Sequence, residues 1–246
     1  ITESIFFIKE EILFYDSIEN IKKLILFRVD KKIGNKSEFI EISIINGNLT
    51  ASENKEEKSE KNEMKINAKN FININDFNNF IFKFDNNEKI LSVIINRKNI
   101  FSFPYKFSFN MKLMRTKTVT DKKKINDINS LTIVIGYPYD SLINIEDNNK
   151  FHEFPYIKIL SINISEEKQE NDDKKNIINL YELRINNIIK ETKNKINNNS
   201  LNDLVEFKLD RKTLLKSKYN NYYSFKLNGV CHRNNIKTQL PQQKSH

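Results

Sequence analysis

The stretch from Met64 to Asn110 constrains the fold most, because the spacing of its apolar residues changes twice. Met64, Ile66 and Ala68 alternate with polar residues, which is the period of a half-buried strand. A stripe at spacings of three and four follows, as in a short amphipathic helix. Its members are Ile74, Phe77, Phe80, Ile81 and Phe84. The sequence therefore predicts a strand that leads into a short helix.

A long β-hairpin is predicted after that helix. Leu91, Val93 and Ile95 restore the period of two, and the polar residues 96–99 indicate a turn. From Phe101 the alternation resumes and runs to Phe109. A weaker version of the strand-to-helix step occurs later. There, residues 205–209 alternate, Asp210 could cap a helix, and Leu214 and Leu215 follow.

The rest of the chain is rich in strand patterns. Apolar runs predict strands at residues 5–8, 12–15, 24–29, 39–45, 131–135, 156–164 and 177–189. Residues 52–63 and 165–175 are charged and predict loops. Residues 111–129 are polar and basic, and form the best candidate for a linker between two halves.

Composition limits what the charge can mean. The 246 residues carry a net charge of +9, which favours an anionic partner in principle. Asn, Lys and Ile dominate, however, as an A+T-rich genome would impose, and no basic run exceeds Lys122-Lys123-Lys124. The lone Cys231 excludes an internal disulfide framework, and no apolar run is long enough to predict a transmembrane helix. The start at Ile1 suggests a fragment or processed product.

Residues suited to catalysis are scattered. His152, His232 and Cys231 do not have the spacing of a metal site or a nucleophile with its base. Four Gly residues leave little for a phosphate-binding loop. Carboxylate pairs such as Glu10-Glu11 occur near Lys residues and are expected at the solvated surface. The sequence predicts no enzyme, no metal and no cofactor.

Several segments resemble one family. ITESIFFI (1–8), SEFIEI (37–42), MKINAKNF (64–71) and residues 91–109 resemble strands of the Hus-type subunit of the checkpoint sliding clamp, the nine-one-one ring. NLYELRI (179–185) and VEFKLDRKTLL (205–215) resemble strands of its second half. Residues 111–163 match poorly, and the string Gly136-Tyr137-Pro138 would suit the Rad-type subunit of the same ring equally well.

This resemblance implies a β-rich α+β fold made of two similar halves, each a sheet with short helices, as in a DNA sliding-clamp subunit. The first half would span residues 1–115, with its first strand missing. Residues 116–129 would be the linker, and residues 130–246 the second half with a polar tail.

The resemblance also implies a function. A clamp subunit performs no chemistry, closes a ring with two related subunits and is loaded by a clamp loader. The ring would encircle double-stranded DNA in the nucleus, without sequence specificity and without contacting membrane, during checkpoint signalling and repair. The candidate DNA-backbone contacts are basic residues on the inner helices and the linker. They are Arg211, Lys212, Lys216, Lys218, Lys83, Lys122, Lys123 and Lys124.

Two other functions fit the same residues. One is a secreted or vacuolar β-rich protein of an A+T-rich parasite, used for adhesion or assembly. Missing disulfides count against it. The other is a structural subunit of an organellar or ribonucleoprotein complex, which fits the basic charge and the long polar loops.

Overall fold

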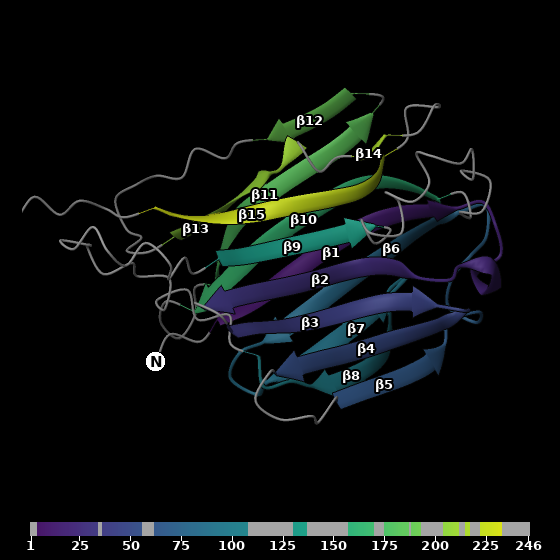
Figure 1. Ribbon diagram of the computed structural model, residues 1–246, viewed down its shortest axis with the longest axis horizontal. Coiled ribbons are helices and arrows are strands. Elements are labelled where there is room, and N and C mark those ends of the chain that lie inside the picture. Colours follow the sequence, from purple (N-terminus) through teal and green to yellow (C-terminus); the bar gives the residue numbers. More distant parts are fainter. Residues whose placement is uncertain are drawn as a thin grey trace, which may run out of the picture.

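The protein forms two antiparallel β-sheets that pack face to face (Figure 1). The computed structural model describes residues 4–33, 36–55, 62–107, 130–136, 157–169, 175–186, 188–192, 204–211, 215–216 and 222–232.

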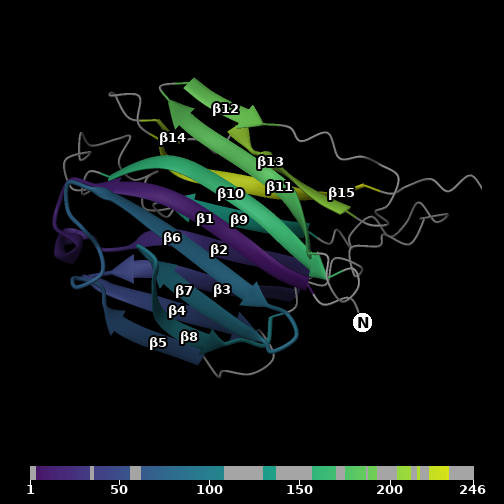
Figure 2. The ribbon, with the colours of Figure 1, turned by 180° about the vertical axis from the view of Figure 1, so that it is seen from behind.

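The first sheet, called sheet A, has the strand order β12-β11-β10-β1-β6-β7-β8. Its strands are β12 (Ile188–Thr192), β11 (Lys175–Asn186), β10 (Ile157–Gln169), β1 (Ser4–Phe14), β6 (Phe77–Asp85), β7 (Ile90–Ile95) and β8 (Lys98–Pro104). Sheet A lies nearer the viewer in Figure 2.

The second sheet, sheet B, has the order β13-β15-β9-β2-β3-β4-β5, and β14 also pairs with β15. Its strands are β13 (Leu204–Leu209), β15 (Tyr222–His232), β9 (Ser130–Gly136), β2 (Leu24–Ile33), β3 (Lys36–Ile45), β4 (Asn48–Lys55), β5 (Asn62–Asn67) and β14 (Leu215–Lys216).

The core lies between the sheets and is rich in phenylalanine. Phe27 of β2 meets two residues of β6, with ring centroids 4.6 Å from Phe82 and 5.3 Å from Phe84. All three side chains are completely buried. Edge-on contacts of this kind add about 0.5–1.5 kcal/mol to the burial of the rings. The Phe27 cluster therefore joins the two sheets directly.

The helix predicted over residues 74–84 is wrong, because Phe77–Asp85 forms the strand β6. Phe80, Phe82 and Phe84 point into the core and are fully buried, while the residues between them are partly exposed. β6 pairs with β1 and β7, so every second side chain of β6 lies on the buried face of the sheet. Three aromatic residues in alternation favour a strand over a helix.

The second predicted helix would cover residues 212–214, which lie outside the described residues. Leu215, expected in that helix, is in the strand β14, and the Asp210 backbone N–H donates to the carbonyl of Lys226, which prolongs the pairing of β13 with β15. Among the described residues the longest helical element is η1 (Ile18–Asn20), a single turn. No helix there is long and apolar enough to cross a membrane.

The prediction of two similar α+β halves is also wrong. β1 lies between β6 and β10, and β2 lies between β3 and β9 (Figure 2). Each sheet thus combines strands from both sides of residues 116–129, the proposed linker, which lies outside the described residues. Antiparallel pairing across the whole sequence produces one β-sandwich.

Most of the strand predictions are confirmed. The β7–β8 hairpin turns at Asn96 and Arg97, whose φ values of 50° and 68° suit a tight hairpin turn. β9 and β13 match their predicted runs closely, and residues 177–186 and 188–189 fall in β11 and β12. The run at 5–8 and residues 12–14 of the next run belong to a single strand, β1, because Lys9 to Glu11 continue its pairing with β6 and β10.

Candidate functional site

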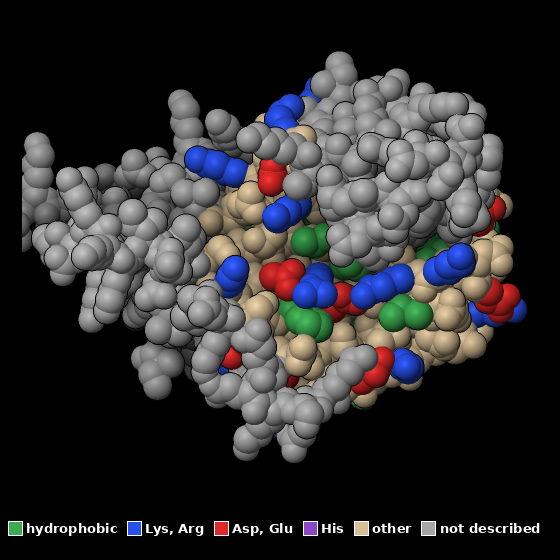
Figure 3. All heavy atoms as spheres, viewed as in Figure 1, with side chains coloured by type: hydrophobic (Ala, Val, Ile, Leu, Met, Phe, Trp, Pro, Cys, Tyr) green, Lys and Arg blue, Asp and Glu red, His purple; other side chains and the backbone are tan. Residues whose placement is uncertain are grey.

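The outer face of sheet B carries a connected set of charged side chains. Ile40, Ile42 and Ile44 of β3 point into the core, so the alternate residues Phe39 and Glu41 point outward. Glu41 lies opposite Arg28 of β2, and Phe39 lies opposite Asp30. Lysine, arginine and acidic side chains gather across the visible middle of this face in Figure 3.

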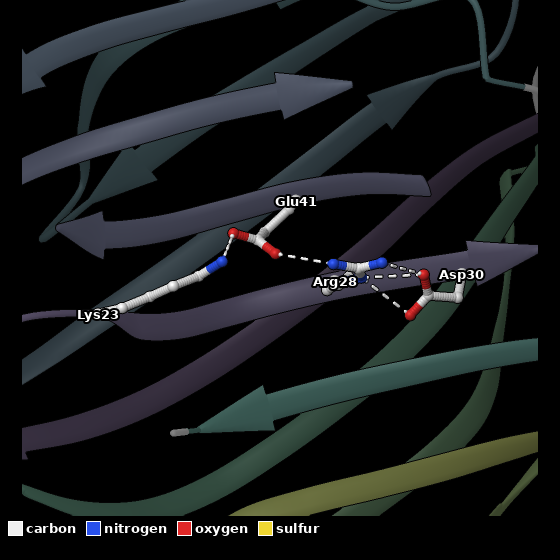
Figure 4. A network of polar contacts seen from close by, with 4 residues as sticks. All are labelled: Lys23, Arg28, Asp30 and Glu41. Atoms are coloured by element: carbon white, nitrogen blue, oxygen red, sulfur yellow. Dashed lines mark hydrogen bonds and ion pairs between the residues drawn. The ribbon is translucent and has the colours of Figure 1, made fainter. Parts of the chain in front are cut away.

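Four residues form a chain of ion pairs, drawn in Figure 4. Lys23 Nζ lies 2.8 Å from Glu41 Oε1, and Arg28 Nη1 lies 3.5 Å from Glu41 Oε2. The Arg28 guanidinium also donates to Asp30, from Nε at 2.9 Å and from Nη2 at 2.8 Å to Oδ1. The order is thus Lys23, Glu41, Arg28, Asp30, with alternating charge. We call these four residues the charged network.

Phe39 also contacts the Arg28 side chain, through its aromatic ring. The guanidinium carbon of Arg28 lies 3.9 Å from the centroid of the Phe39 ring, a cation–π distance. Burial lowers the pKa of Arg28, but the hydrogen bond and charge of Asp30, with the charge of Glu41, outweigh that effect. The pKa of Arg28 therefore lies above its ordinary value, and the cation is permanent.

Exposure differs along the charged network. The side chains of Lys23, Arg28 and Asp30 are 38%, 30% and 27% exposed, whereas that of Glu41 is 4% exposed. Glu41 is therefore the fixed centre, and the other three reach solvent. Nothing in the network resembles a nucleophile with its base. Its chemistry is that of hydrogen-bond donors and acceptors at set positions.

Short polar side chains lie beside the network on the same face. Ser43 of β3 lies opposite Thr50 of β4, and Ser52 lies opposite Glu41. The hydroxyls of Ser43 and Thr50 are buried, and neither has a hydrogen-bond partner within the described part of the chain. The solvent-facing chemistry of this part of sheet B is therefore that of the charged network and not of these buried hydroxyls.

The predicted DNA contacts do not come together in the described residues. Lys83 lies on β6, on the outer face of sheet A opposite Phe7 and Ser92. Arg211 follows β13 of sheet B, is 68% exposed and lies 3.9 Å from Glu191 Oε2. Lys216 is in β14, and only its backbone is described. Lys212, Lys218, Lys122, Lys123 and Lys124 lie outside the described residues.

Sequence reasoning missed all four members of the charged network. Arg28 and Asp30 are two residues apart, which places them on one face of a strand. That spacing is a weak signal in this chain, because charged residues make up 30% of it. Glu41 falls within the segment 37–42 that resembles a clamp strand, and nothing in that resemblance singles it out. Within the described residues no set of three or more His, Cys, Asp or Glu side chains could hold a metal.

No protein-family model matches the chain, and no curated protein matches it. Among solved structures, sheep galectin-11 in complex with glycerol is 12% identical with a TM-score of 0.26, covering 42% of this chain and 73% of its own. The botulinum neurotoxin serotype D binding domain is 8% identical with a TM-score of 0.30, covering 98% of this chain and 79% of its own.

A botulinum neurotoxin type C structure, from a toxin that depends on interaction with two ganglioside molecules to get into cells, is 11% identical with a TM-score of 0.30. It covers 98% of this chain and 80% of its own. At these TM-scores the three likenesses carry no argument about fold or function.

Proposed function

We propose that this chain is a non-enzymatic binding domain that holds an uncharged, polyhydroxylated ligand of the glycan class on the outer face of sheet B. The charged network is the observation that carries the proposal. It places two cations and two carboxylates in alternation on a rigid sheet.

Charge balance favours an uncharged ligand. The Arg28 guanidinium donates to Asp30 and Glu41, and Glu41 also binds Lys23, so the two positive charges are matched by two negative charges. An anion such as a phosphate would gain from Lys23 and Arg28 but would be repelled by Asp30 and Glu41. A neutral ligand meets no such repulsion.

Hydrogen-bond chemistry favours hydroxyl groups. A hydroxyl both donates and accepts, so it can bind a carboxylate and a neighbouring cation at once. Asp30, Arg28 and Lys23 offer this combination at the solvent boundary. Bonds to charged partners contribute about 1.5–3 kcal/mol each, and a preformed site avoids most of the entropy cost of ordering its side chains.

This proposal is a specific form of the adhesion or assembly function predicted from the sequence. The DNA-clamp function stays a prediction, and the two-half fold that supported it was wrong. Within the described residues, the basic side chains nominated for DNA lie on different sheets.

A glycan array probed with the full chain tests the proposal. We expect retention of a neutral oligosaccharide that weakens at least tenfold in Lys23→Met and Asp30→Asn, since each change removes one exposed member of the charged network. Glu11→Gln, on the outer face of sheet A opposite Asn79, is the matched control and should bind as the wild type does. Absence of any retained glycan, or equal binding by all variants, would contradict the proposal.

A further inference from the structure

Glu10 occupies the middle of an apolar row that crosses sheet A. Its partner on β6 is Phe80 and its partner on β10 is Ile162. Beyond them, Ile95 of β7 lies opposite Phe80 and Leu183 of β11 lies opposite Ile162. Glu10 is 3% exposed, and the other four are 0–1% exposed. The predicted solvated position for Glu10 is therefore wrong, although Glu11 does point outward.

Within the described part of the chain, the carboxyl group of Glu10 has nothing polar to bind. Neither Oε1 nor Oε2 has a hydrogen-bond partner among the residues described. An ionised carboxylate without a partner is strongly disfavoured in an apolar interior, so such a group takes up a proton instead. The surroundings of Glu10 thus stabilise its protonated, neutral form relative to its ionised form.

No titratable side chain of the described strands beside Glu10 faces it. The inward residues of β1 next to it are Ile8 and Ile12, and those of β6 are Asn78, Phe80 and Phe82. On β10 the inward residues near it are Ile159, Ile162 and Ile164. Each of these side chains lacks a charge.

Inward-facing ionisable groups lie elsewhere in the sandwich. On sheet A they include Glu166, opposite Phe6, Tyr181, opposite Ile164, and Glu191 of β12, opposite Leu183. Tyr105, which follows β8, is also buried. On sheet B, Lys31 lies over the Phe107 ring, and Glu53 accepts hydrogen bonds from the Lys106 N–H. Among the described residues, burial is accordingly the cause that raises the pKa of Glu10 well above its ordinary value.

The strand pairing is irregular next to this acid. The register of β1 with β10 shifts between Glu11 and Ile12, which leaves Leu160 of β10 without a directly paired residue. Such bulges interrupt the ladder locally. The ladder between β1 and β10 is therefore interrupted within two residues of Glu10, and a local opening there would admit water to its carboxyl group.

We propose that Glu10 is a pH-responsive element of the fold, protonated while the sandwich is closed and loosening β1 from β10 when it ionises. The unfolded or opened chain releases the proton at the ordinary carboxyl pKa, whereas the closed chain releases it at a higher pH. Stability from this group is complete below the ordinary pKa and declines as the pH rises towards the folded value. The sandwich is held more tightly in acid than in neutral solution.

Urea unfolding of the full chain between pH 4.5 and 8 tests this, with wild type compared to Glu10→Gln and Glu10→Leu. We expect the unfolding constant of the wild type, relative to Glu10→Gln, to rise by up to about tenfold per pH unit until the folded pKa is passed. Glu11→Gln is the control for loss of a carboxylate at the neighbouring exposed position, and should keep the wild-type pH dependence. Parallel curves for wild type and Glu10→Gln would overturn the proposal.

A measurement on the wild type alone covers the case in which neither variant folds. Carbon-13 NMR of the glutamate carboxyls should show one signal that stays protonated after the other glutamates have ionised, together with faster hydrogen exchange in β1 and β10 above its midpoint. Titration of every glutamate in the ordinary range would overturn the proposal. Neither readout depends on a ligand, so this inference stands or falls separately from the proposed function.

Discussion

The Arg28 guanidinium stacks on Phe39, with its carbon 3.9 Å from the ring centroid, while its nitrogens bind Asp30 and Glu41. Arg28 and Phe39 come from neighbouring strands, β2 and β3, so the stack is set by the register of the two strands. Because the guanidinium is planar, it can contact a ring with its face and carboxylates with its edge at the same time.

Arg28→Lys is therefore expected to be a disruptive change. The ammonium of a lysine keeps the charge, but it cannot form the two-nitrogen contact with Asp30 and stacks poorly on Phe39. We expect a loss of about 1 kcal/mol of unfolding free energy, because the group is partly exposed, together with weaker ligand binding. Urea denaturation measures the first. Lys158→Arg on β10 is the reciprocal control, and stability unchanged by Arg28→Lys would argue against the stack.

Phe82→Ala removes the ring that lies closest to Phe27. Both rings are fully buried and contribute to the contact between the sheets, so a cavity would form at their junction. We expect a destabilisation of about 3–5 kcal/mol, measured by chemical denaturation. Phe77→Ala on the same strand is the control, since Phe77 is 51% exposed and should cost far less. Equal losses for the two variants would mean that Phe82 is not a core residue.

Asn96 serves the hairpin turn in two ways. Its φ is 50°, and its amide donates to the Phe71 carbonyl at 3.1 Å and to Asn78 Oδ1 at 2.9 Å, while its oxygen accepts from the Asn79 N–H at 3.0 Å. Asn96→Ala should lower the free energy of unfolding by about 2–3 kcal/mol. It leaves partly buried groups without their hydrogen bonds and places alanine in the left-handed region.

Arg97 offers a matched change at the next position of the turn. Its φ is 68°, and glycine adopts this value without strain, so Arg97→Gly is expected to be neutral or to stabilise the fold slightly. Thermal unfolding of both variants checks the pair. A larger loss in Arg97→Gly than in Asn96→Ala would show that the turn conformation is not the determinant.

Tyr105 links pH to stability at the alkaline end. Burial raises the pKa of its phenol above the ordinary value, and Asp85 and Glu53 raise it further. Its hydroxyl lies 3.0 Å from the Asp85 carbonyl oxygen and 3.2 Å from Asn86 Oδ1. The stability from this group is complete below the ordinary tyrosine pKa and is lost as the pH rises beyond it.

We therefore expect Tyr105 to resist ionisation until the protein unfolds, as should Tyr181, whose pKa burial also raises; both are visible by ultraviolet absorbance during an alkaline titration. Tyr105→Phe should lose about 1 kcal/mol at pH 7 and show less alkaline destabilisation than the wild type. A variant whose alkaline unfolding curve coincides with that of the wild type would rule out this role for Tyr105.

The strands could be predicted because the alternation of apolar and polar residues is a local pattern, as in β7 with Leu91, Val93 and Ile95. The helix prediction for β6 was wrong because Phe77, Phe80, Ile81 and Phe84 also fit the spacing of a helix face. What decided between the two was pairing with β1 and β7, partners that lie elsewhere in the sequence. Local spacing cannot reveal such partners. For the same reason, the sequence suggested two similar halves where the strands form a single sandwich.

The candidate site depended on register in the same way. Arg28 and Glu41 face each other only because β2 and β3 pair in one particular alignment. Glu10 was beyond prediction for a different reason. From the sequence, the pair Glu10-Glu11 is expected at the solvated surface, between two separate strand runs. The inward orientation of Glu10 follows only once these runs are one strand, β1, in which Ile8 and Ile12 to either side are buried.

The position of β1 between β6 and β10 has a consequence for the order of folding. Ile5 pairs with Asp85 on one side and with Glu167 on the other. The first strand of the chain, β1, therefore has one partner, β10, that is synthesised much later. Contacts this distant in sequence slow folding. During synthesis, the edge of β1 that pairs with β10 stays unpaired until β10 leaves the ribosome. A nascent chain that has reached only β8 would therefore expose an unpaired apolar strand edge, and we expect it to need a chaperone or to associate with its own copies.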